Sequence, residues 1–447
     1  MIRDFCRCFH GGGDFDSTDV ADRDPVVLVS GIGGSILNSK PKKFGLEIRV
    51  WVRIFLADLE FRKKLWSKYN PETGYTEPLD DSTEIVVPKD DYGLYAIDIL
   101  DPSLLIKCLH LSDVHHFHDM IDMLVGCGYK KGTTLFGYGY DFRQSNRIGQ
   151  LIDGLKERLE TAYKASGGRK VNIISHSMGG LLVSCFISFH SDIFSRYVNK
   201  WITLATPFQG APGCINDSIL TGVQFVDGFK SYFFVSRWSM HQLLVECPSV
   251  YEMLANADFN WKKQPEIQVW RKHCNNGETS AELEIYGSNE CVYLFEEALK
   301  NNELNYNGKT VDLPFNFAIL EWAAGTRELL NKTQLPEGVS FYNIYGTSFD
   351  TPFDVRYGSE SSPIDDLSEI CHSTPQYSYV DGDGTVPSES AMADNFDAVE
   401  RVGVKASHRG LLNNEKVFQL IKNWLGVPSK VKGRHSKTAK VMDMHIR

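Results

Sequence analysis

The sequence predicts an α/β fold, in which a mostly parallel sheet is wrapped by helices. Short apolar runs rich in β-branched residues alternate with segments of helical periodicity, and several of these helical segments follow a run directly. The predicted helices are Gly149–Ser166 and Met178–His190. The predicted strands are Val26–Ser30, Thr133–Phe136, Val171–Ser175, Trp201–Ala205, Ser340–Tyr345 and Tyr377–Val380, with a last strand near Val402–Val404.

A sharp reversal at residues 171–186, VNIISHSMGGLLVSCF, is the first feature that indicates chemistry. It joins a short strand to an apolar stretch with helical spacing. So short a reversal strains the residue at its apex and requires small residues two positions away, because strand and helix must pass closely. Small residues lie on both sides of Ser177, which is the residue that such a turn exposes.

A serine hydroxyl is a weak nucleophile that needs a base, usually a histidine held by a carboxylate. In hydrolases built on this kind of sheet, the acid follows the serine along the chain and the histidine comes last. The sequence KASHRGLL follows the last predicted strand, so we expect His408 to be the base. His372 is the competitor, although it precedes the segment that carries the expected acid.

The acid is expected in YVDGDGTVP, residues 379–387, where a strand runs into Asp383 between two glycines. Asp381 remains a rival acid. A calcium loop is the alternative interpretation. An EF-hand counted from Asp381 needs Gly at its sixth position and Glu at its twelfth, where this chain has Val386 and Met392.

Two backbone N–H groups are expected to hold the negative charge that forms on the attacked carbonyl oxygen. One follows the nucleophile, at Met178, and the other comes from the loop after the first strand. That loop, in VVLVSGIGGSIL, assigns the second donor to Ile32, with Gly33 as the alternative. A dinucleotide site fits poorly, because the third glycine of the fingerprint is missing and no helical run follows.

A histidine cluster, HHFHD at residues 115–119, raises the hypothesis of a metal site. No second cluster with compatible spacing is present in the sequence. The side chains of His115, His118, Asp119 and Asp122 are better explained as the exposed side of a helix that runs to Val125. We therefore predict no metal ligand and no cofactor.

Composition limits the classes of function. Lys and Arg number 47 and Asp and Glu number 57, so the net charge is −10, which is unfavourable for general nucleic-acid binding. We find neither an apolar core of signal-peptide length at the start nor a run of 18 apolar residues. The ten cysteines lack paired metal spacing, and free thiols are typical of a reducing compartment. We expect a cytoplasmic protein that associates peripherally with membranes.

The chain divides into three parts. Residues 1–24 form a flexible segment in which Cys6 and Cys8 could carry acyl chains, residues 25–428 form the α/β domain, and residues 429–447 form a basic tail. Within the domain we predict a cap at about 208–336, without a clear strand series. The basic tail is interpreted as solvated, with a weak hold on anionic membrane as the alternative.

The segment at about 44–70, called the lid segment below, begins FGLEIRVWVRIFLADLEFRKKLW. Charged residues interrupt its aromatic and aliphatic residues, so it cannot span a bilayer. One interpretation is a mobile lid that lies on lipid through Trp51, Phe55 and Phe61. The other interpretation is a core strand and helix, since aromatic stripes are more often buried than lipid-binding.

Six motifs occur in the order seen in lecithin–cholesterol acyltransferases, and the chain most resembles the plant cytosolic phospholipase A members of that family. They are VLVSGIGGS, YGYDFRQS, SHSMGG, ATPFQGAPG, YVDGDGTVP and SHRG, and the similarity covers roughly residues 25–425. The resemblance implies an α/β-hydrolase core, a cap and a membrane-binding lid. It also implies Ser177 as nucleophile, Asp383 as acid, His408 as base, and the N–H groups of Ile32 and Met178 as oxyanion donors.

Two departures from the family pattern bear on function. Ser175 stands where the turn usually has glycine, and the lid segment lacks the cysteines that form a disulfide in secreted relatives. Together with the resemblance, these residues predict a calcium-independent phospholipase A that acts on glycerophospholipids such as phosphatidylcholine at a membrane surface. The alternatives are an acyltransferase to a sterol or diacylglycerol hydroxyl and, from another class, an inactive lipid-binding module.

Overall fold

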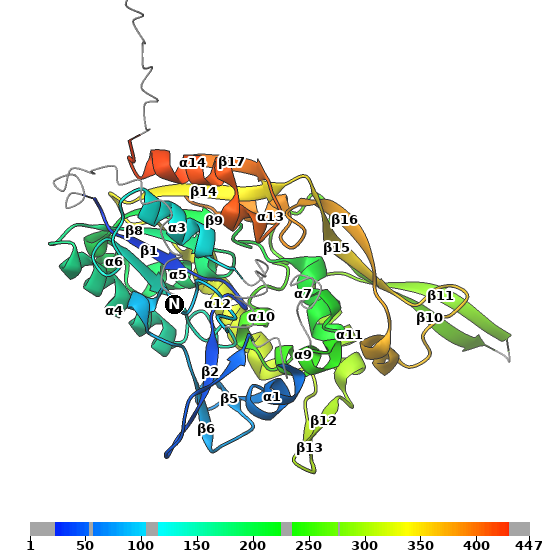
Figure 1. Ribbon diagram of the computed structural model, residues 1–447. Coiled ribbons are helices and arrows are strands. Elements are labelled where there is room, and N and C mark those ends of the chain that lie inside the picture. Colours follow the sequence, from blue (N-terminus) through cyan, green and yellow to red (C-terminus); the bar gives the residue numbers. More distant parts are fainter. Residues whose placement is uncertain (1–22, 53–56, 104–114, 225–234, 276–277, 429–447) are drawn as a thin grey trace, which may run out of the picture.

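A computed structural model describes residues 23–52, 57–103, 115–224, 235–275 and 278–428. At its centre lies a six-stranded sheet with the order β17-β14-β9-β8-β1-β7, in which every pairing is parallel (Figure 1). This confirms the predicted fold class. The strands are β1 (Val26–Val29), β7 (Leu135–Tyr138), β8 (Val171–His176), β9 (Val198–Leu204), β14 (Ser340–Thr347) and β17 (Ala398–Lys405).

Both faces of this sheet are buried, which explains the continuous apolar runs of its strands. Val27 and Val29 point into one hydrophobic core, whereas Val26 and Leu28 point into a second. The first core lies under helices α4, α5 and α6 and the second under α3 and α14. These helices are α3 (His118–Gly126), α4 (Gly149–Ala165), α5 (Gly179–Phe189), α6 (Ser191–Tyr197) and α14 (Glu415–Trp424).

One predicted strand belongs to a different sheet. Tyr377–Val380 lies in β16 (Gln376–Gly382), which pairs antiparallel with β15 (Phe349–Tyr357) in a four-stranded sheet of order β11-β10-β15-β16. Because β15 follows β14 directly after Ser348, the chain passes from the central sheet into this second sheet. The run of strand-forming residues identified this strand. The strand with which it pairs is decided by contacts between residues that are far apart in the chain.

The cap contains strands, and the prediction that it has no strand series is wrong. It includes β10 (Ile267–Asn275), β11 (Glu278–Tyr286), β12 (Glu303–Tyr306) and β13 (Lys309–Asp312). The β10–β11 hairpin projects from the body and β11 is largely exposed, so these strands lack a buried apolar run (Figure 1). The cap helices are α7 (Pro212–Leu220), α9 (Arg237–Leu244), α10 (Pro248–Tyr251), α11 (Cys291–Leu299) and α12 (Phe317–Lys332).

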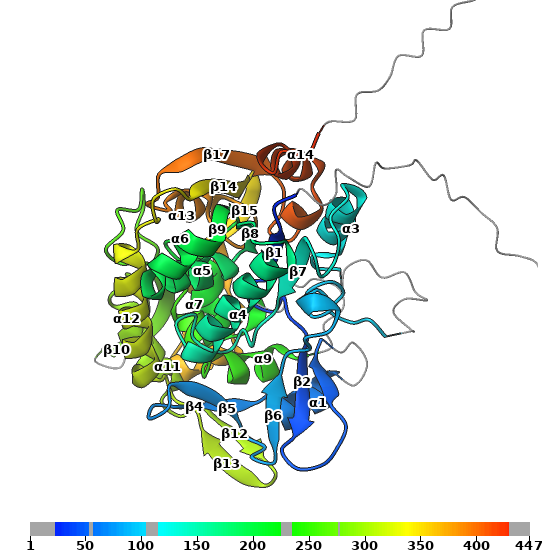
Figure 2. The same cartoon turned by 90° about the vertical axis from the view of Figure 1, so that its left-hand side faces the viewer.

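The lid segment and the residues around it form a small structure at the end of the molecule opposite β17 and α14 (Figure 2). It contains a three-stranded antiparallel sheet of order β3-β2-β6, a helix and a hairpin. The elements are β2 (Leu37–Pro41), β3 (Ile48–Trp51), α1 (Ala57–Lys64), β4 (Ser67–Asn70), β5 (Tyr75–Pro78) and β6 (Thr83–Val86).

Parts of the predicted segments fall outside the described residues. They are most of the N-terminal segment, including Cys6 and Cys8, residues 53–56 of the lid segment, residues 225–234 and 276–277 of the cap, and the basic tail at 429–447. Among the helices that the structure does describe, none has the length and apolar character needed to cross a bilayer.

Candidate active site

Ser177 lies at the sharp turn between β8 and α5. Its φ of +55° is in the left-handed region, which is costly for a residue other than glycine. Two contacts hold this backbone shape: the Ser177 N–H donates to the carbonyl of Leu204 at 2.8 Å, and the Ser177 carbonyl accepts from the N–H of Gly180 at 3.0 Å. The turn therefore presents the hydroxyl at the carboxyl end of the central strands.

Close packing at this turn explains the small residues around Ser177. A Cβ on Gly179 would lie 2.4 Å from the carbonyl oxygen of Ser30, and a Cβ on Gly31 would lie 2.7 Å from the Cβ of Ser177. Ser175, which replaces the usual glycine, is fully buried, and its hydroxyl accepts a hydrogen bond from the Trp201 indole at 2.9 Å. A small polar side chain is thus accommodated here because it has a partner.

The structure brings Ser177, His408 and Asp383 together. Nε2 of His408 lies 2.9 Å from Oγ of Ser177, and Nδ1 lies 2.8 Å from Oδ2 of Asp383. Because a carboxylate only accepts, Nδ1 carries the proton, which leaves Nε2 to accept from the serine hydroxyl. The other carboxylate oxygen accepts from the N–H groups of Thr385 and Val386 at 2.9 and 2.7 Å.

The rival residues lie elsewhere. Asp381 is exposed, and its carboxylate accepts from the N–H of Ser348 at 2.6 Å and from the hydroxyl of Ser388 at 3.0 Å. His372 ends a short 3₁₀ helix and stacks on Trp238, with ring centroids 5.3 Å apart. Neither residue belongs to the hydrogen-bonded chain that starts at Ser177.

The two N–H groups predicted as oxyanion donors flank this chain. Ile32 lies in a turn closed by a hydrogen bond from the Gly34 N–H to the Gly31 carbonyl at 3.1 Å, and Met178 directly follows Ser177. A Cβ on Gly31 would lie 3.3 Å from the nitrogen of Met178, so the turn 31–34 lies against the sharp turn at Ser177. Within the described part of the chain, neither N–H donates a hydrogen bond.

Two further histidines, His176 and His116, lie next to His408, and the sequence pattern did not assign either of them to the site. His176 Nε2 lies 3.0 Å from the main-chain carbonyl of His408, and the ring of His116 lies 5.6 Å from that of His176. Burial lowers the pKa of His176 well below its usual value and that of His116 to about 3, so both rings are neutral. The available signal was the position of His176 immediately before the serine.

The prediction that Trp51 and Phe61 contact lipid is wrong. Trp51 is 1% exposed and Phe61 is fully buried, which matches the alternative interpretation of a core strand and helix. Trp51 packs against Phe61 and Phe142, with ring centroids 6.2 and 5.2 Å away. Large aromatic rings fill the space between the lid segment and the domain, so they are unavailable to lipid. Phe55 lies outside the described residues.

The helical interpretation of the histidine cluster is confirmed for His118, Asp119 and Asp122, which lie on α3, but it is wrong for His115, which lies before that helix. His118 begins α3, its Nδ1 lies 2.7 Å from Asp98, and its ring packs against that of His115 with centroids 4.3 Å apart. Across the described residues, no group of three or more His, Cys, Asp or Glu side chains is arranged to hold a metal ion.

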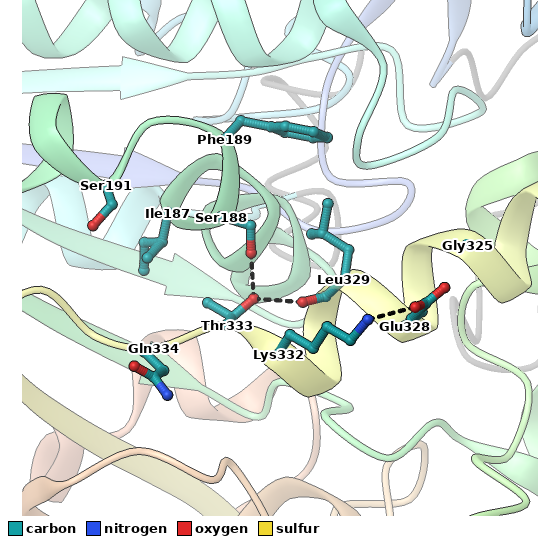
Figure 3. A pocket seen from close by; sticks show the side chains of 10 residues that line it. All are labelled: Ile187, Ser188, Phe189, Ser191, Gly325, Glu328, Leu329, Lys332, Thr333 and Gln334. Carbon is teal, nitrogen blue, oxygen red and sulfur yellow. Dashed lines mark hydrogen bonds and ion pairs between the residues drawn. The ribbon is translucent and has the colours of Figure 1, made fainter.

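A surface pocket of about 500 Å³ lies where the end of α5 meets α12 (Figure 3). A hydrogen bond joins the hydroxyls of two lining residues, Ser188 and Thr333, and Phe189 and Leu329 add apolar surface. None of the residues of the Ser177 site lines this pocket, although α5 connects the two places.

A buried carboxyl fastens the lid segment to the cap. Glu246 is 1% exposed, and its carboxylate accepts from the main-chain N–H of Tyr69 at 2.7 Å and from the side-chain amide of Asn316 at 3.3 Å. Burial raises the pKa of Glu246 from 4.5 to about 7. The contact between the two parts of the molecule is therefore sensitive to pH.

Glu246→Gln is expected to stabilise the protein above pH 7 and to leave it unchanged near pH 4.5. Because burial raises the folded-state pKa, the contribution of Glu246 to the free energy of unfolding is fully present below pH 4.5. That contribution is lost as the pH rises through about 7. The gain at pH 8 is up to about 3 kcal/mol in unfolding free energy. Denaturant unfolding at pH 4.5 and pH 8 measures this gain, and Glu321→Gln, at an exposed position, is the control. An equal change in unfolding free energy at both pH values would contradict the prediction.

The fold and the Ser177 site define a serine hydrolase of the α/β-hydrolase class. The family model described as lecithin:cholesterol acyltransferase matches residues 62–406, and the chain belongs to this family. It is 71% identical to the protein named Phospholipase A(1) LCAT3 of Arabidopsis thaliana, over 98% of each chain. It is 52% identical to Lecithin-cholesterol acyltransferase-like 4 of the same plant, over 90% of this chain and 76% of the relative.

More distant proteins are also similar to this chain. The chain is 25% identical to the human protein named Lysosomal phospholipase A and acyltransferase, over 82% of this chain and 80% of the relative. A chain in the crystal structure of the Tle4-Tli4 complex superposes with a TM-score of 0.52 at 13% identity, covering 90% of this chain and 98% of that one.

Proposed function

We propose that this protein is a phospholipase A that hydrolyses a fatty acyl ester of a glycerophospholipid, such as phosphatidylcholine, through an acyl-serine intermediate. The observation that carries the proposal is the hydrogen-bonded chain from Ser177 through His408 to Asp383. The name of the 71% identical relative, a phospholipase A(1), supports a phospholipid ester as the substrate.

In the first half of the reaction, Nε2 of His408 takes the Ser177 proton while Oγ attacks the ester carbonyl. The N–H groups of Ile32 and Met178 hold the negative charge that develops on the carbonyl oxygen, a contribution of about 3–4 kcal/mol per donor. His408 then gives its proton to the departing lysophospholipid oxygen, and Asp383 keeps the imidazole in the required tautomer. The groups of this step all come from the chain itself.

In the second half, an acceptor hydroxyl attacks the acyl-serine with His408 as base. Water gives a free fatty acid, whereas a sterol or diacylglycerol hydroxyl gives a new ester. Hydrolysis is the main proposal, and acyl transfer is the second candidate because the family name and the human relative's name both include an acyltransferase.

Purified protein incubated with phosphatidylcholine vesicles carrying a labelled acyl chain tests the proposal. We expect labelled free fatty acid, with or without sterol in the vesicle and with a chelator present. Labelled steryl ester as the main product would favour the second candidate. Absence of both products, together with a Ser177 that does not react with a fluorophosphonate, would favour the inactive lipid-binding module.

The surface that contacts the membrane is proposed to be the β2–β3 connection. Phe44 is fully exposed, Leu46 is 86% exposed, and Lys42 and Lys43 beside them are also exposed. Leu59, on the neighbouring helix α1, is 52% exposed. Exposed apolar side chains next to lysines suit a bilayer surface, because the apolar groups enter the boundary region while the lysines meet phosphate groups.

Phe44→Ser/Leu46→Ser is expected to weaken binding to phosphatidylcholine vesicles by about tenfold or more. Each fully buried side chain of this kind contributes about 1.5–3 kcal/mol, so even partial insertion is measurable. Hydrolysis of a water-soluble short-chain ester should stay unchanged, because the pair lies outside the Ser177 site.

Vesicle sedimentation measures this binding. The control is Val399→Ser, since Val399 is 63% exposed on β17 at the opposite end of the molecule. Unchanged vesicle binding by the double variant, or an equal loss in the control, would show that the membrane contact lies elsewhere.

We also propose a cytoplasmic location with peripheral membrane association. Seven cysteines among the described residues are free thiols, of which Cys274 is exposed, and exposed thiols are typical of a reducing compartment. Fractionation of cells that express the full chain tests this, with the protein expected in the cytosolic and membrane-associated fractions. Recovery with secreted material would contradict it.

A further inference from the structure

Trp51 connects the lid segment to the turn that carries Ile32. It ends β3, and its indole N–H donates to the main-chain carbonyl of Gly33 at 2.8 Å. Gly33 has a φ of +69° at the third position of the turn 31–34, a conformation that a type II turn requires. The indole therefore stabilises the backbone of the turn and does not act through one of the side chains of the turn.

Two rigid peptide planes transmit this contact. In a peptide bond, the C=O of one residue and the N–H of the next lie in one plane. The Gly33 carbonyl shares its plane with the N–H of Gly34, which donates to the Gly31 carbonyl at 3.1 Å. The Gly31 carbonyl in turn shares its plane with the N–H of Ile32. A continuous chain of hydrogen bonds thus runs from the Trp51 indole to the Ile32 N–H.

We propose that Trp51 is a positioning residue, which acts through the turn 31–34 to aim the N–H of Ile32 at the oxygen that becomes negatively charged. This inference rests on the proposed function, because an oxyanion forms at this site only while an acyl group is transferred to or from Ser177. Gly33 is buried, so its carbonyl would lose its partner without the indole N–H, and the two planes could then rotate.

Loss of the hydrogen bond from the Trp51 indole is expected to slow the chemical step. An oxyanion donor contributes only when it points at the oxygen position of the transition state, whereas substrate binding does not depend on that orientation. Loss of the indole N–H should therefore lower kcat and leave KM and vesicle binding unchanged. A purely structural role of Trp51 would instead lower the amount of folded enzyme without this separation of kcat from KM.

Trp51→Phe tests the inference, because phenylalanine retains a ring against Phe61 and Phe142 but lacks the N–H. The matched control is Trp66→Phe. Trp66 belongs to the same lid segment, is 5% exposed, and donates its indole N–H to the Ser239 carbonyl at 2.9 Å. Both variants lose one buried indole–carbonyl hydrogen bond, but only the first of these bonds reaches the turn 31–34.

We expect kcat for fatty-acid release from phosphatidylcholine vesicles to fall about tenfold in Trp51→Phe, with KM and sedimentation on vesicles within twofold of wild type. Trp66→Phe should keep kcat within twofold. Thermal unfolding verifies that both variants are folded. An unchanged kcat in Trp51→Phe, or the same loss in Trp66→Phe, would overturn the inference.

The rate of Ser177 phosphonylation by a fluorophosphonate gives a second readout that needs no phospholipid. In that reaction Oγ of Ser177 bonds to phosphorus, fluoride leaves, His408 takes the hydroxyl proton, and the phosphonyl oxygen occupies the oxyanion position. A rate about tenfold lower in Trp51→Phe supports the inference even if wild type releases no fatty acid, an outcome that defeats the proposed function alone. Equal rates would contradict the role of Trp51.

Discussion

Ser177→Ala is expected to lower fatty-acid release from phosphatidylcholine by about 100,000-fold or more, because no other group can form the acyl intermediate. The residual rate would come from the oxyanion donors and from substrate binding alone. Release of labelled fatty acid from vesicles measures the effect, and the variant should also fail to react with a fluorophosphonate. Substrate binding should persist, since the hydroxyl takes part in the reaction rather than in holding the lipid.

The matched control for this variant is Ser184→Ala. Ser184 is buried on α5, and its hydroxyl donates to the Gly180 carbonyl at 3.0 Å, within the same helix that follows the nucleophile. Removing that hydroxyl costs one local hydrogen bond and should leave the rate within about twofold. If Ser177→Ala kept more than a few per cent of the wild-type rate, the acyl-serine mechanism would be excluded.

Asp383→Asn is expected to lower kcat by about 10,000-fold while leaving the fold intact. The amide would donate to Nδ1 of His408, so the imidazole would carry its proton on Nε2 and could no longer accept the Ser177 proton. Fatty-acid release at saturating vesicle concentration measures kcat. Because the defect is the wrong tautomer of the neutral His408 imidazole, raising the pH should restore little activity.

Asp381→Asn provides the matched control, since Asp381 lies two residues away at the end of the same strand. Its carboxylate accepts from Ser348 and Ser388 and makes no contact with His408. We expect its activity to stay within a fewfold of wild type. The opposite ranking of the two variants would assign the acid to Asp381 and would require a different arrangement of this loop.

The parts of the site that depend on local backbone shape could be predicted from the sequence. The small residues around Ser177 predicted a strained turn, and its φ of +55° bears this out. The glycines around Asp383 likewise predicted a tight turn at the end of a strand. In both places the constraint acts between residues only a few positions apart, so the pattern of residue types is sufficient.

The burial of individual aromatic residues could not be predicted from the sequence. Trp51 and Phe61 belong to an aromatic stripe that suits a lipid surface, but Phe142 and other distant residues cover them. Phe44 and Leu46, only a few residues earlier, are exposed instead. Composition is similar on both sides of β3, so the sequence could not separate the covered positions from the uncovered ones.

The sequence by itself determined the order of the central-sheet strands along the chain, the strained turn at Ser177 and the identity of the residues able to act as nucleophile, base and acid. The tertiary structure decided which acid lies beside His408, which sheet contains β16, and which aromatic residues are buried. The physical reason is one of range: backbone strain is set by adjacent residues, whereas burial and hydrogen-bond partners are set by segments that meet only after the chain has folded.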